Sequence, residues 1–187
     1  MRVIAGSAKR IQLKTLKGFG TRPTTDRIKE TLFNMIDPWI VDCSFLDLFA
    51  GSGGIGIEAL SRGAGEAVFV EKNPVAAEII HENLKATRLD GNAEIIQADI
   101  SKGLHRLRGR QFDYIFMDPP YQGQFEHNTL KLIGELGLLR EDGLIIVEAL
   151  LETEFAYLSS MGYSIVKEKR YKTNKHVFIE MKSEEQR

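Results

Sequence analysis

Short apolar runs alternate with amphipathic stretches along residues 43–148, and this alternation restricts the fold more than any other feature of the chain. Strand and helix patterns that follow one another in this way are typical of βαβ units, in which helices cross over a sheet of parallel strands. We therefore predict an α/β fold with helices in the gaps between the strands. The predicted parallel strands are Phe45–Phe49, Ala67–Glu71, Ala93–Gln97, Phe112–Met117 and Leu144–Glu148.

The two ends of the chain depart from this pattern. Tyr163–Tyr171 and His176–Met181 have the period of strands, and the segment between them can turn. We predict that they form an antiparallel hairpin that closes the sheet. At the other end, Arg2–Ala5 and Ile11–Leu13 predict a second, smaller hairpin.

Two helices can be placed from the spacing of their apolar residues. Pro74–Thr87 has a proline at an early helical position and apolar side chains that recur at helical intervals. Thr24–Asn34 begins at Thr24 or Thr25, whose hydroxyl can cap the first turn. We expect each helix to pack its apolar face on the sheet.

The composition is that of a soluble globular protein with one domain, since the 187 residues are 43% hydrophobic and 27% charged. Cys43 is the single cysteine, which excludes an intramolecular disulfide, and no Cys/His cluster has metal-ligand spacing, so we predict no metal. The first residues lack the apolar core of a signal peptide, and no stretch approaches the roughly 18 apolar residues of a membrane span. We therefore predict a cytoplasmic protein without a membrane partner.

The net charge of −1 hides two basic regions. Residues 1–30 carry eight basic and two acidic side chains, and residues 167–176 carry five basic side chains, one acidic side chain and His176. Basic regions at both ends of an otherwise acidic chain indicate a nucleic-acid surface, on which His176 is a further candidate for phosphate contact. The predicted contacts are Arg2, Lys9, Arg10, Lys14, Arg22, Lys172 and Lys175.

The first predicted strand runs into a glycine-rich turn, residues 50–56, that opens a helix. Such a turn lets a ligand approach the backbone closely, but alone it does not distinguish a dinucleotide from S-adenosylmethionine. Asp47 before the turn and Glu58 after it place carboxylates near the loop. Carboxylates suit a cation that bears an amino group better than they suit a pyrophosphate, so charge favours S-adenosylmethionine.

Two further acidic residues complete the predicted cofactor site. Glu71 ends the second strand twenty residues after Gly51, where an acidic residue typically holds ribose hydroxyls. Asp99 follows the third strand, where it can meet an adenine amino group or cap a helix. The predicted cofactor-binding residues are Thr24, Asp47, Phe49, Ala50, Gly51, Ser52, Gly53, Gly56, Glu71, Lys72, Asp99 and Ile100.

The fourth strand ends in Asp118-Pro119-Pro120-Tyr121, which we predict to be the catalytic segment. An exocyclic amine of a nucleobase is a poor nucleophile, because its lone pair is delocalised into the ring. Acceptors such as the Asp118 carboxylate and the Pro119 carbonyl, placed on its N–H groups, stabilise the positive charge that develops as the nitrogen attacks a methyl group. Pro120 stiffens the loop, and the Tyr121 ring offers a face on which a base can stack.

These motifs together resemble the class I S-adenosylmethionine-dependent methyltransferases, whose fold is Rossmann-like. Residues 22–34, residues 47–53 and residues 118–121 more specifically resemble the RsmD-type small-subunit rRNA guanine-N2 methyltransferases, and the resemblance covers nearly the whole chain. It departs from that pattern at Ile11, where a small residue such as glycine is expected in the hairpin turn.

The resemblance implies a seven-stranded, mostly parallel sheet with an antiparallel last hairpin. It implies methyl transfer from S-adenosylmethionine to the N2 atom of a guanine in 16S rRNA, on the assembling or assembled small ribosomal subunit. Residues 1–187 then form one methyltransferase domain, with an RNA-binding hairpin at 1–20, a catalytic core at 21–182 and a tail at 183–187. A monomer is favoured.

Five other functions share parts of this pattern. A nicotinamide-dependent oxidoreductase could use the glycine turn and Glu71, but it leaves residues 118–121 unexplained. A cytosine-C5 methyltransferase needs a thiolate nucleophile, and Cys43 precedes the first strand. An enzyme acting on adenine N6 or on a protein glutamine amide would use the same acceptors, so only the resemblance favours guanine. A non-catalytic assembly factor would bind the cofactor without transferring a methyl group, and the intact acidic and glycine positions argue against it.

Overall fold

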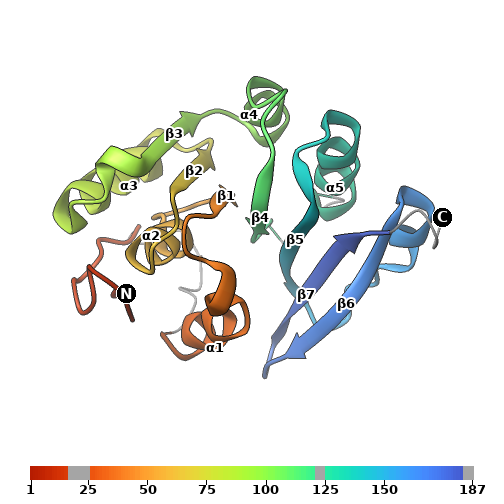
Figure 1. Cartoon of the computed structure of the whole chain (residues 1–187), viewed down its shortest axis with the longest axis horizontal. Coiled ribbons are helices and arrows are strands. Elements are labelled where there is room, and N and C mark those ends of the chain that lie inside the picture. Colours follow the sequence, from red (N-terminus) through yellow and green to blue (C-terminus); the bar gives the residue numbers. More distant parts are fainter. Residues whose placement is uncertain (17–25, 121–124, 183–187) are drawn as a thin grey trace.

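A seven-stranded sheet forms the centre of the protein in the computed structural model, which describes residues 1–16, 26–120 and 125–182 (Figure 1). The strand order is β3-β2-β1-β4-β5-β7-β6. The strands β1 to β5 run parallel, and β7 is antiparallel to both β5 and β6. Their bounds are β1 Ser44–Leu48, β2 Glu66–Glu71, β3 Ala93–Gln97, β4 Phe112–Met117, β5 Leu139–Leu150, β6 Tyr163–Arg170 and β7 Asn174–Met181.

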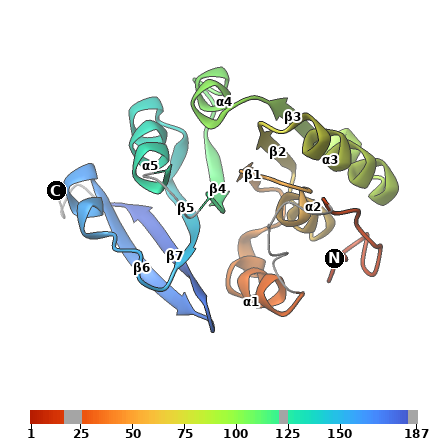
Figure 2. The same cartoon turned by 180° about the vertical axis from the view of Figure 1, so that it is seen from behind.

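Helices cover both faces of the sheet. On the first face, α1, α2 and α3 share one apolar cluster with the N-terminal residues, and on the second face α4, α5 and η3 share another (Figures 1 and 2). The α-helices are α1 Asp26–Ile36, α2 Gly54–Ser61, α3 Pro74–Thr87, α4 Ile100–Arg106 and α5 Phe125–Leu136. The 3-10 helices are η1 Asp37–Trp39, η2 Asp90–Asn92 and η3 Ala156–Met161.

Burial on both faces explains why the central strands read as continuous apolar runs. In β1, Phe45 belongs to the first-face cluster, whereas Leu46 and Leu48 belong to the second. A strand that is covered on both sides needs apolar residues at successive positions, so its sequence does not alternate between apolar and polar. Asp47, the exception in β1, points to the first face and is almost fully buried.

The predicted fold class is confirmed, and the sequence located most strands closely. β3, β4 and α3 have the predicted bounds, and α3 begins with Asn73 as its cap, because the Asn73 side chain accepts hydrogen bonds from two backbone N–H groups of the first turn. β5 is longer than predicted, and β7 begins two residues earlier than predicted. Residues 24 and 25, where the first predicted helix was to begin, lie outside the described residues.

The N-terminal segment forms the predicted small hairpin, in which backbone hydrogen bonds join residues 1–3 to residues 10–13. Arg2 and Gln12 form an antiparallel bridge, and the chain turns between them through left-handed conformations at Gly6 and Arg10. Ile11, where the resemblance predicted a small residue such as glycine, does not adopt a left-handed conformation. Figure 2 shows this segment lying beside α2 and α3. Gly6 lies so close to α2 that a Cβ atom there would be 1.7 Å from the Ser61 carbonyl oxygen, so no larger residue fits without a shift.

Glu58 of α2 anchors the N-terminal segment from within the core. Its carboxylate accepts hydrogen bonds from the backbone N–H groups of Ile4 and Ala5, at 2.8 and 3.0 Å, and pairs with Lys29 of α1 at 3.0 Å and with Arg62 at 2.9 Å. Glu58 and Lys29 are fully buried. Burial lowers the pKa of Lys29, and the neighbouring Glu58 opposes that shift. The expectation that Glu58 adds negative charge at the glycine turn is therefore wrong, because two cations and two amides already engage it.

We predict that Glu58→Gln lowers the free energy of unfolding by about 3–5 kcal/mol, because it leaves buried cations without their counter-charge. Urea unfolding followed by circular dichroism would measure this change. The matched control is Glu66→Gln, which removes a half-exposed partner of Arg110 and should cost less than about 1 kcal/mol. Equal losses in the two variants would contradict the anchoring role of Glu58.

Candidate functional site

The carboxyl ends of the parallel strands bring the predicted cofactor residues together. The backbone N–H of Gly51, in the turn after β1, donates to Glu71 Oε2 at 2.8 Å, and the N–H of Asn73 donates to Glu71 Oε1 at 2.8 Å. Glu71 therefore ties the turn to the start of α3. Each carboxylate oxygen can accept a second hydrogen bond, so this arrangement leaves Glu71 able to hold ligand hydroxyls as well.

The glycines of the turn have different roles. A Cβ atom on Gly51 would meet only the Phe49 carbonyl oxygen, at 4.0 Å, and Gly51 has a φ of +56°. This glycine therefore leaves open space beside the backbone. A Cβ atom on Gly53 would press on Ile80 and Ile57, and one on Gly56 would lie 2.3 Å from the Phe69 ring. Gly53 and Gly56 thus allow close packing of α2, and of the three glycines Gly51 is the one with room for a ligand.

Asp47 is a buried carboxyl group beneath the turn. Its Oδ2 accepts a hydrogen bond from the N–H of Gly56 at 2.9 Å. Burial raises the pKa of Asp47 to about 8, with a smaller contribution from nearby Glu71, while the Gly56 hydrogen bond opposes the shift. Without a neighbouring cation Asp47 is therefore mostly protonated at pH 7, and a bound cation would favour its ionised form.

The catalytic segment follows β4, next to β1. β4 pairs with β1 on one side, where Phe116 lies opposite Asp47, and with β5 on the other, where Met117 lies opposite Val147. Asp118 is therefore the first residue after β4, which lies between β1 and β5. Burial raises the pKa of Asp118 well above its usual range, and the charges of Glu148 and Asp47 add to this effect. Pro119 is buried and Pro120 is exposed, whereas Tyr121 lies outside the described residues.

A polar cluster behind Asp118 was not predicted from the sequence. Glu148 of β5 is buried, and its carboxylate accepts a hydrogen bond from Asn174 Nδ2 at 2.5 Å and bonds to His176 Nε2 at 3.2 Å. His176 Nδ1 in turn lies 3.2 Å from the Tyr171 hydroxyl. The available signal in the sequence was a charged residue, Glu148, inside the apolar run of a strand that is buried on both faces.

The remaining predicted cofactor residues surround this centre. Phe49 has a left-handed φ of +59°, and its ring contacts the edge of Phe125. Asp99 caps α4 by accepting from the N–H of Lys102 at 3.0 Å, and this hydrogen bond lowers the pKa of Asp99. Of the others, Ala50, Ser52 and Ile100 are partly buried, Lys72 is exposed, and Thr24 lies outside the described residues.

Asn83 of α3 connects the glycine turn to the N-terminal segment. Its Nδ2 donates to the carbonyl oxygens of Ser52 and Lys14, at 2.9 and 3.0 Å, and its Oδ1 accepts from the N–H of Lys14 at 2.8 Å. No local sequence pattern indicates this contact, because Ser52 and Lys14 are 31 and 69 positions from Asn83.

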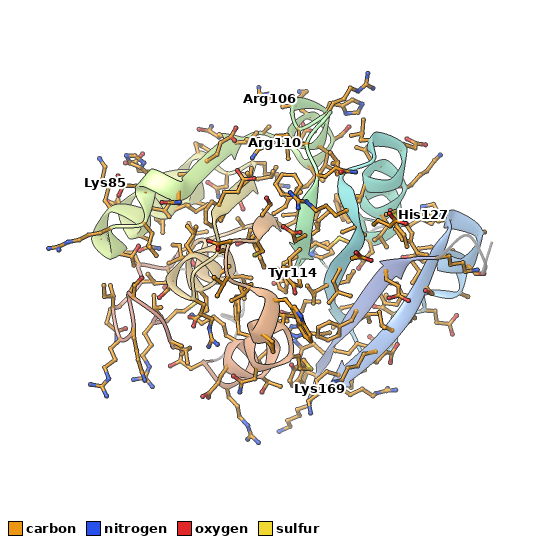
Figure 3. All side chains as sticks on the ribbon, in the orientation of Figure 1. Lys85, Arg106, Arg110, Tyr114, His127 and Lys169 are labelled. Atoms are coloured by element: carbon orange, nitrogen blue, oxygen red, sulfur yellow. The ribbon has the colours of Figure 1, made fainter. Side chains whose placement is uncertain are left out.

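The predicted nucleic-acid contacts divide into two groups. Lys9, Arg10 and Lys172 are exposed, Arg2 pairs with Asp26, and Lys14 pairs with Glu82 while its side chain stays 67% exposed. Lys169, at the end of β6, is also exposed and lies at the rim of the molecule (Figure 3). Arg22 lies outside the described residues.

Two residues of the C-terminal basic region are not placed for phosphate contact. The side chain of Lys175 is only 7% exposed, with its amine 3.0 Å from Glu168 Oε1 and above the Phe155 ring. His176 is fully buried against Glu148. Strand alternation explains this result, because Lys175 and His176 point to opposite faces of β7 and both faces are covered.

Within residues 1–16, 26–120 and 125–182, no group of three or more His, Cys, Asp or Glu side chains could hold a metal ion. In the same part of the chain, no helix is long and apolar enough to cross a membrane.

The strand order, the antiparallel last hairpin and the glycine-rich turn after β1 define a methyltransferase with a Rossmann-like fold. The family described as Conserved hypothetical protein 95 matches residues 1–180. Ribosomal RNA small subunit methyltransferase D of Escherichia coli strain K12 is 38% identical over 152 residues, which are 81% of this chain and 76% of the relative. The chain belongs to the ribosomal RNA small subunit methyltransferase D family.

Two further relatives agree with this assignment. The Bacillus subtilis strain 168 protein YlbH, a candidate rRNA methyltransferase by its name, is 46% identical over 156 residues, which are 82% of this chain and 85% of YlbH. The solved structure of the Escherichia coli protein yhhF, described as a candidate methyltransferase, superposes with a TM-score of 0.86 at 34% identity. The superposition covers 97% of this chain and 98% of yhhF.

We predict that Asp47→Asn makes the ligand-free protein more stable relative to wild type as the pH rises from 5 to 8. A carboxyl group whose folded pKa is raised from 3.8 to about 8 binds its proton more tightly in the folded state, so its contribution to stability is complete below pH 4 and is lost as the pH rises towards 8. Asparagine has no such dependence. The difference in unfolding free energy should grow by about 1 kcal/mol per pH unit.

Urea unfolding at several pH values would measure this difference. Asp142→Asn, the same change at an exposed position, should give a difference that varies little with pH. A difference for Asp47→Asn that is constant between pH 5 and 8 would contradict the protonated state of Asp47.

Proposed function

We propose that the protein transfers a methyl group from S-adenosylmethionine to the N2 atom of a guanine in small-subunit rRNA. The observation that carries this proposal is the position of Asp118 and Pro119 at the end of β4, directly beside the strand that leads into the glycine turn. The names of its relatives, which act on small-subunit rRNA, support the substrate class.

The residues at the strand ends fit S-adenosylmethionine, which supplies an electrophilic methyl group on a positively charged sulfur. The open side of Gly51 leaves room for the methionine part of the cofactor. A positive charge near buried Asp47 would stabilise its ionised form. Glu71 has acceptor positions left for ribose hydroxyls, and Asp99, which follows the neighbouring strand, could accept from an adenine amino group. A pyrophosphate would instead bring negative charge next to Asp47 and Glu71.

Asp118 and Pro119 supply the acceptors that an exocyclic amine needs. As the nitrogen attacks the methyl carbon, it becomes pyramidal and gains positive charge, and its N–H groups become stronger donors. Acceptors fixed in advance stabilise this state more than they stabilise the ground state. Adenine N6 would meet the same acceptors, so the choice of guanine N2 rests on the resemblance to the RsmD-type enzymes.

The first experiment incubates the protein with isotopically labelled S-adenosylmethionine and unmodified small subunits, alongside deproteinised rRNA. Nucleosides are then identified by mass spectrometry. Labelled N2-methylguanosine is the expected product, and the two substrates show which form of the RNA is used. Labelled N6-methyladenosine would overturn the target, and cofactor binding without any label would favour an assembly factor.

We predict that Asp118→Ala lowers kcat by about 10²–10³-fold, the loss typical of one catalytic acceptor, while the Kd of the cofactor changes less than about threefold. Single-turnover rates and calorimetry would measure the two quantities. Asp142→Ala, at an exposed position, is the control for the loss of one negative charge. Equal losses of rate and cofactor affinity would contradict the catalytic assignment of Asp118.

We predict that replacing Lys9, Arg10 and Lys14 together by alanine weakens RNA binding and flattens its salt dependence, because each phosphate contact releases a counterion. The slope of log K against log salt should fall in magnitude by about 2–3. The control is a triple variant of Arg106, Arg108 and Lys131, which removes the same charge from the end of α4, the turn after it and α5 on the second face. An unchanged slope in the first variant would remove the N-terminal segment from the RNA surface.

A further inference from the structure

Glu148 and Asp118 are neighbours where the pairing of β4 with β5 ends. The last pair between β4 and β5 is Met117 with Val147, so the two carboxylates are each one residue beyond it. Adjacent parallel strands are about 4.8 Å apart. Both side chains follow residues of the first face, since Phe116 and Ile146 belong to its apolar cluster and side chains alternate along a strand. The two carboxylates therefore face the same side of the sheet.

Two hydrogen-bond partners hold Glu148 there, and two aromatic side chains contact one of these partners. Asn174 donates to one oxygen and His176 bonds to the other, while the His176 ring meets the edge of the Phe116 ring. A neutral His176 that donates from Nε2 to Glu148 can accept at Nδ1 from the Tyr171 hydroxyl, which satisfies both ring nitrogens. Burial raises the pKa of Tyr171 to about 12, so its hydroxyl keeps the proton it donates.

Burying the Glu148 carboxylate beside Asp118 costs free energy, and the packing of β5 does not require a carboxylate at this position. An apolar residue at position 148 would fill a strand covered on both faces without placing a second carboxylate beside Asp118. The structure instead engages both oxygens of Glu148 and orients them with four side chains.

We propose that Glu148 is a positioning residue of the catalytic site: its carboxylate, held beside Asp118, directs to Asp118 the proton that the methylated amine releases. The inference rests on the proposed methyl transfer to a nitrogen. In that step the nitrogen bonds to the methyl carbon, the carbon–sulfur bond breaks with its electron pair going to sulfur, and the nitrogen then loses one proton. An oxygen of Asp118, already in contact with that N–H, accepts this proton.

The change of charge during the reaction suits this role. Before transfer, the positive charge of the methyl donor favours the ionised form of Asp118. After transfer sulfur is neutral, and the neighbouring negative charge of Glu148 then favours protonated Asp118. The ionisable groups on this face of the sheet include Asp47, Glu148, His176 and Tyr171 near Asp118, and Tyr114, Lys29 and Glu58 elsewhere on it. The Lys175 amine lies on the opposite face with Glu168.

A carboxyl titration of the ligand-free protein tests the inference without RNA or a methyl donor. Aspartate is labelled with ¹³C at the side-chain carboxyl, and the signal of Asp118 is identified as the one that is missing in Asp118→Asn. We expect the Asp118 midpoint in Glu148→Gln to be about one pH unit below that in the wild type, because a neighbouring negative charge has been removed. The acid limb of the methyl-transfer rate should shift to lower pH by the same amount.

Two further variants separate charge from shape. Glu148→Asp retains the charge and should restore the midpoint towards that of the wild type, even though its contacts with Asn174 and His176 are disturbed. Glu180→Gln removes the same charge four residues further along β7 from His176 and should leave the midpoint unchanged.

An Asp118 midpoint in folded Glu148→Gln that equals the wild-type value would overturn the inference and leave Glu148 a structural residue. A midpoint that moves equally in Glu148→Gln and Glu148→Asp would also overturn it, because a change of packing would then explain the shift. Since the titration needs no reaction, a midpoint that depends on the charge supports the coupling whether or not the nucleoside analysis finds N2-methylguanosine, and the two proposals can fail separately.

Discussion

The pairing of β1 with β4 is the constraint on which the site depends. From β1, the chain adds β2 and β3 on one side of the sheet and then β4 and β5 on the other, so the β1–β4 pair is the topological switch point of the sheet. The turn after β1 leads to α2 on the first face, whereas the segment after β4 leads to α5 on the second. The two connections therefore diverge, and in open α/β sheets ligands bind at such a point. The glycine turn and Asp118 come together here although 67 residues separate Gly51 from Asp118.

Uncompensated carboxylates distinguish this end of the sheet from the rest of the interior. Buried Glu58 is paired with Lys29 and Arg62, so its charge is satisfied by the protein itself. Asp47 and Asp118 have raised pKa values, because burial and neighbouring acids act on them. A cation bound near these two groups would favour their ionised forms, and this property agrees with a sulfonium donor.

The N-terminal segment connects the two proposed binding surfaces. It carries exposed Lys9 and Arg10, and Asn83 ties its last described part to Ser52 of the glycine turn. Glu58 holds the same segment by accepting hydrogen bonds from its backbone N–H groups. A basic surface that is rigidly attached to the cofactor turn can place RNA relative to the methyl donor.

The sequence by itself determined the strands, α3 and the glycine turn, and it located the proposed catalytic segment at the end of a strand, because strand burial, helix capping and turn chemistry are local and leave a pattern in neighbouring residues. It could not place Glu58, Lys175, His176 or Asn83, since the partners of these residues lie on other elements and the sign of a charge does not reveal whether it faces solvent. Gly51, Gly53 and Gly56 are alike in sequence, and only the packing of α2 against Phe69 and Ile80 separated the open position from the two filled ones. Tertiary structure likewise decided that Glu148 stands beside Asp118, because that contact depends on the register of β4 with β5.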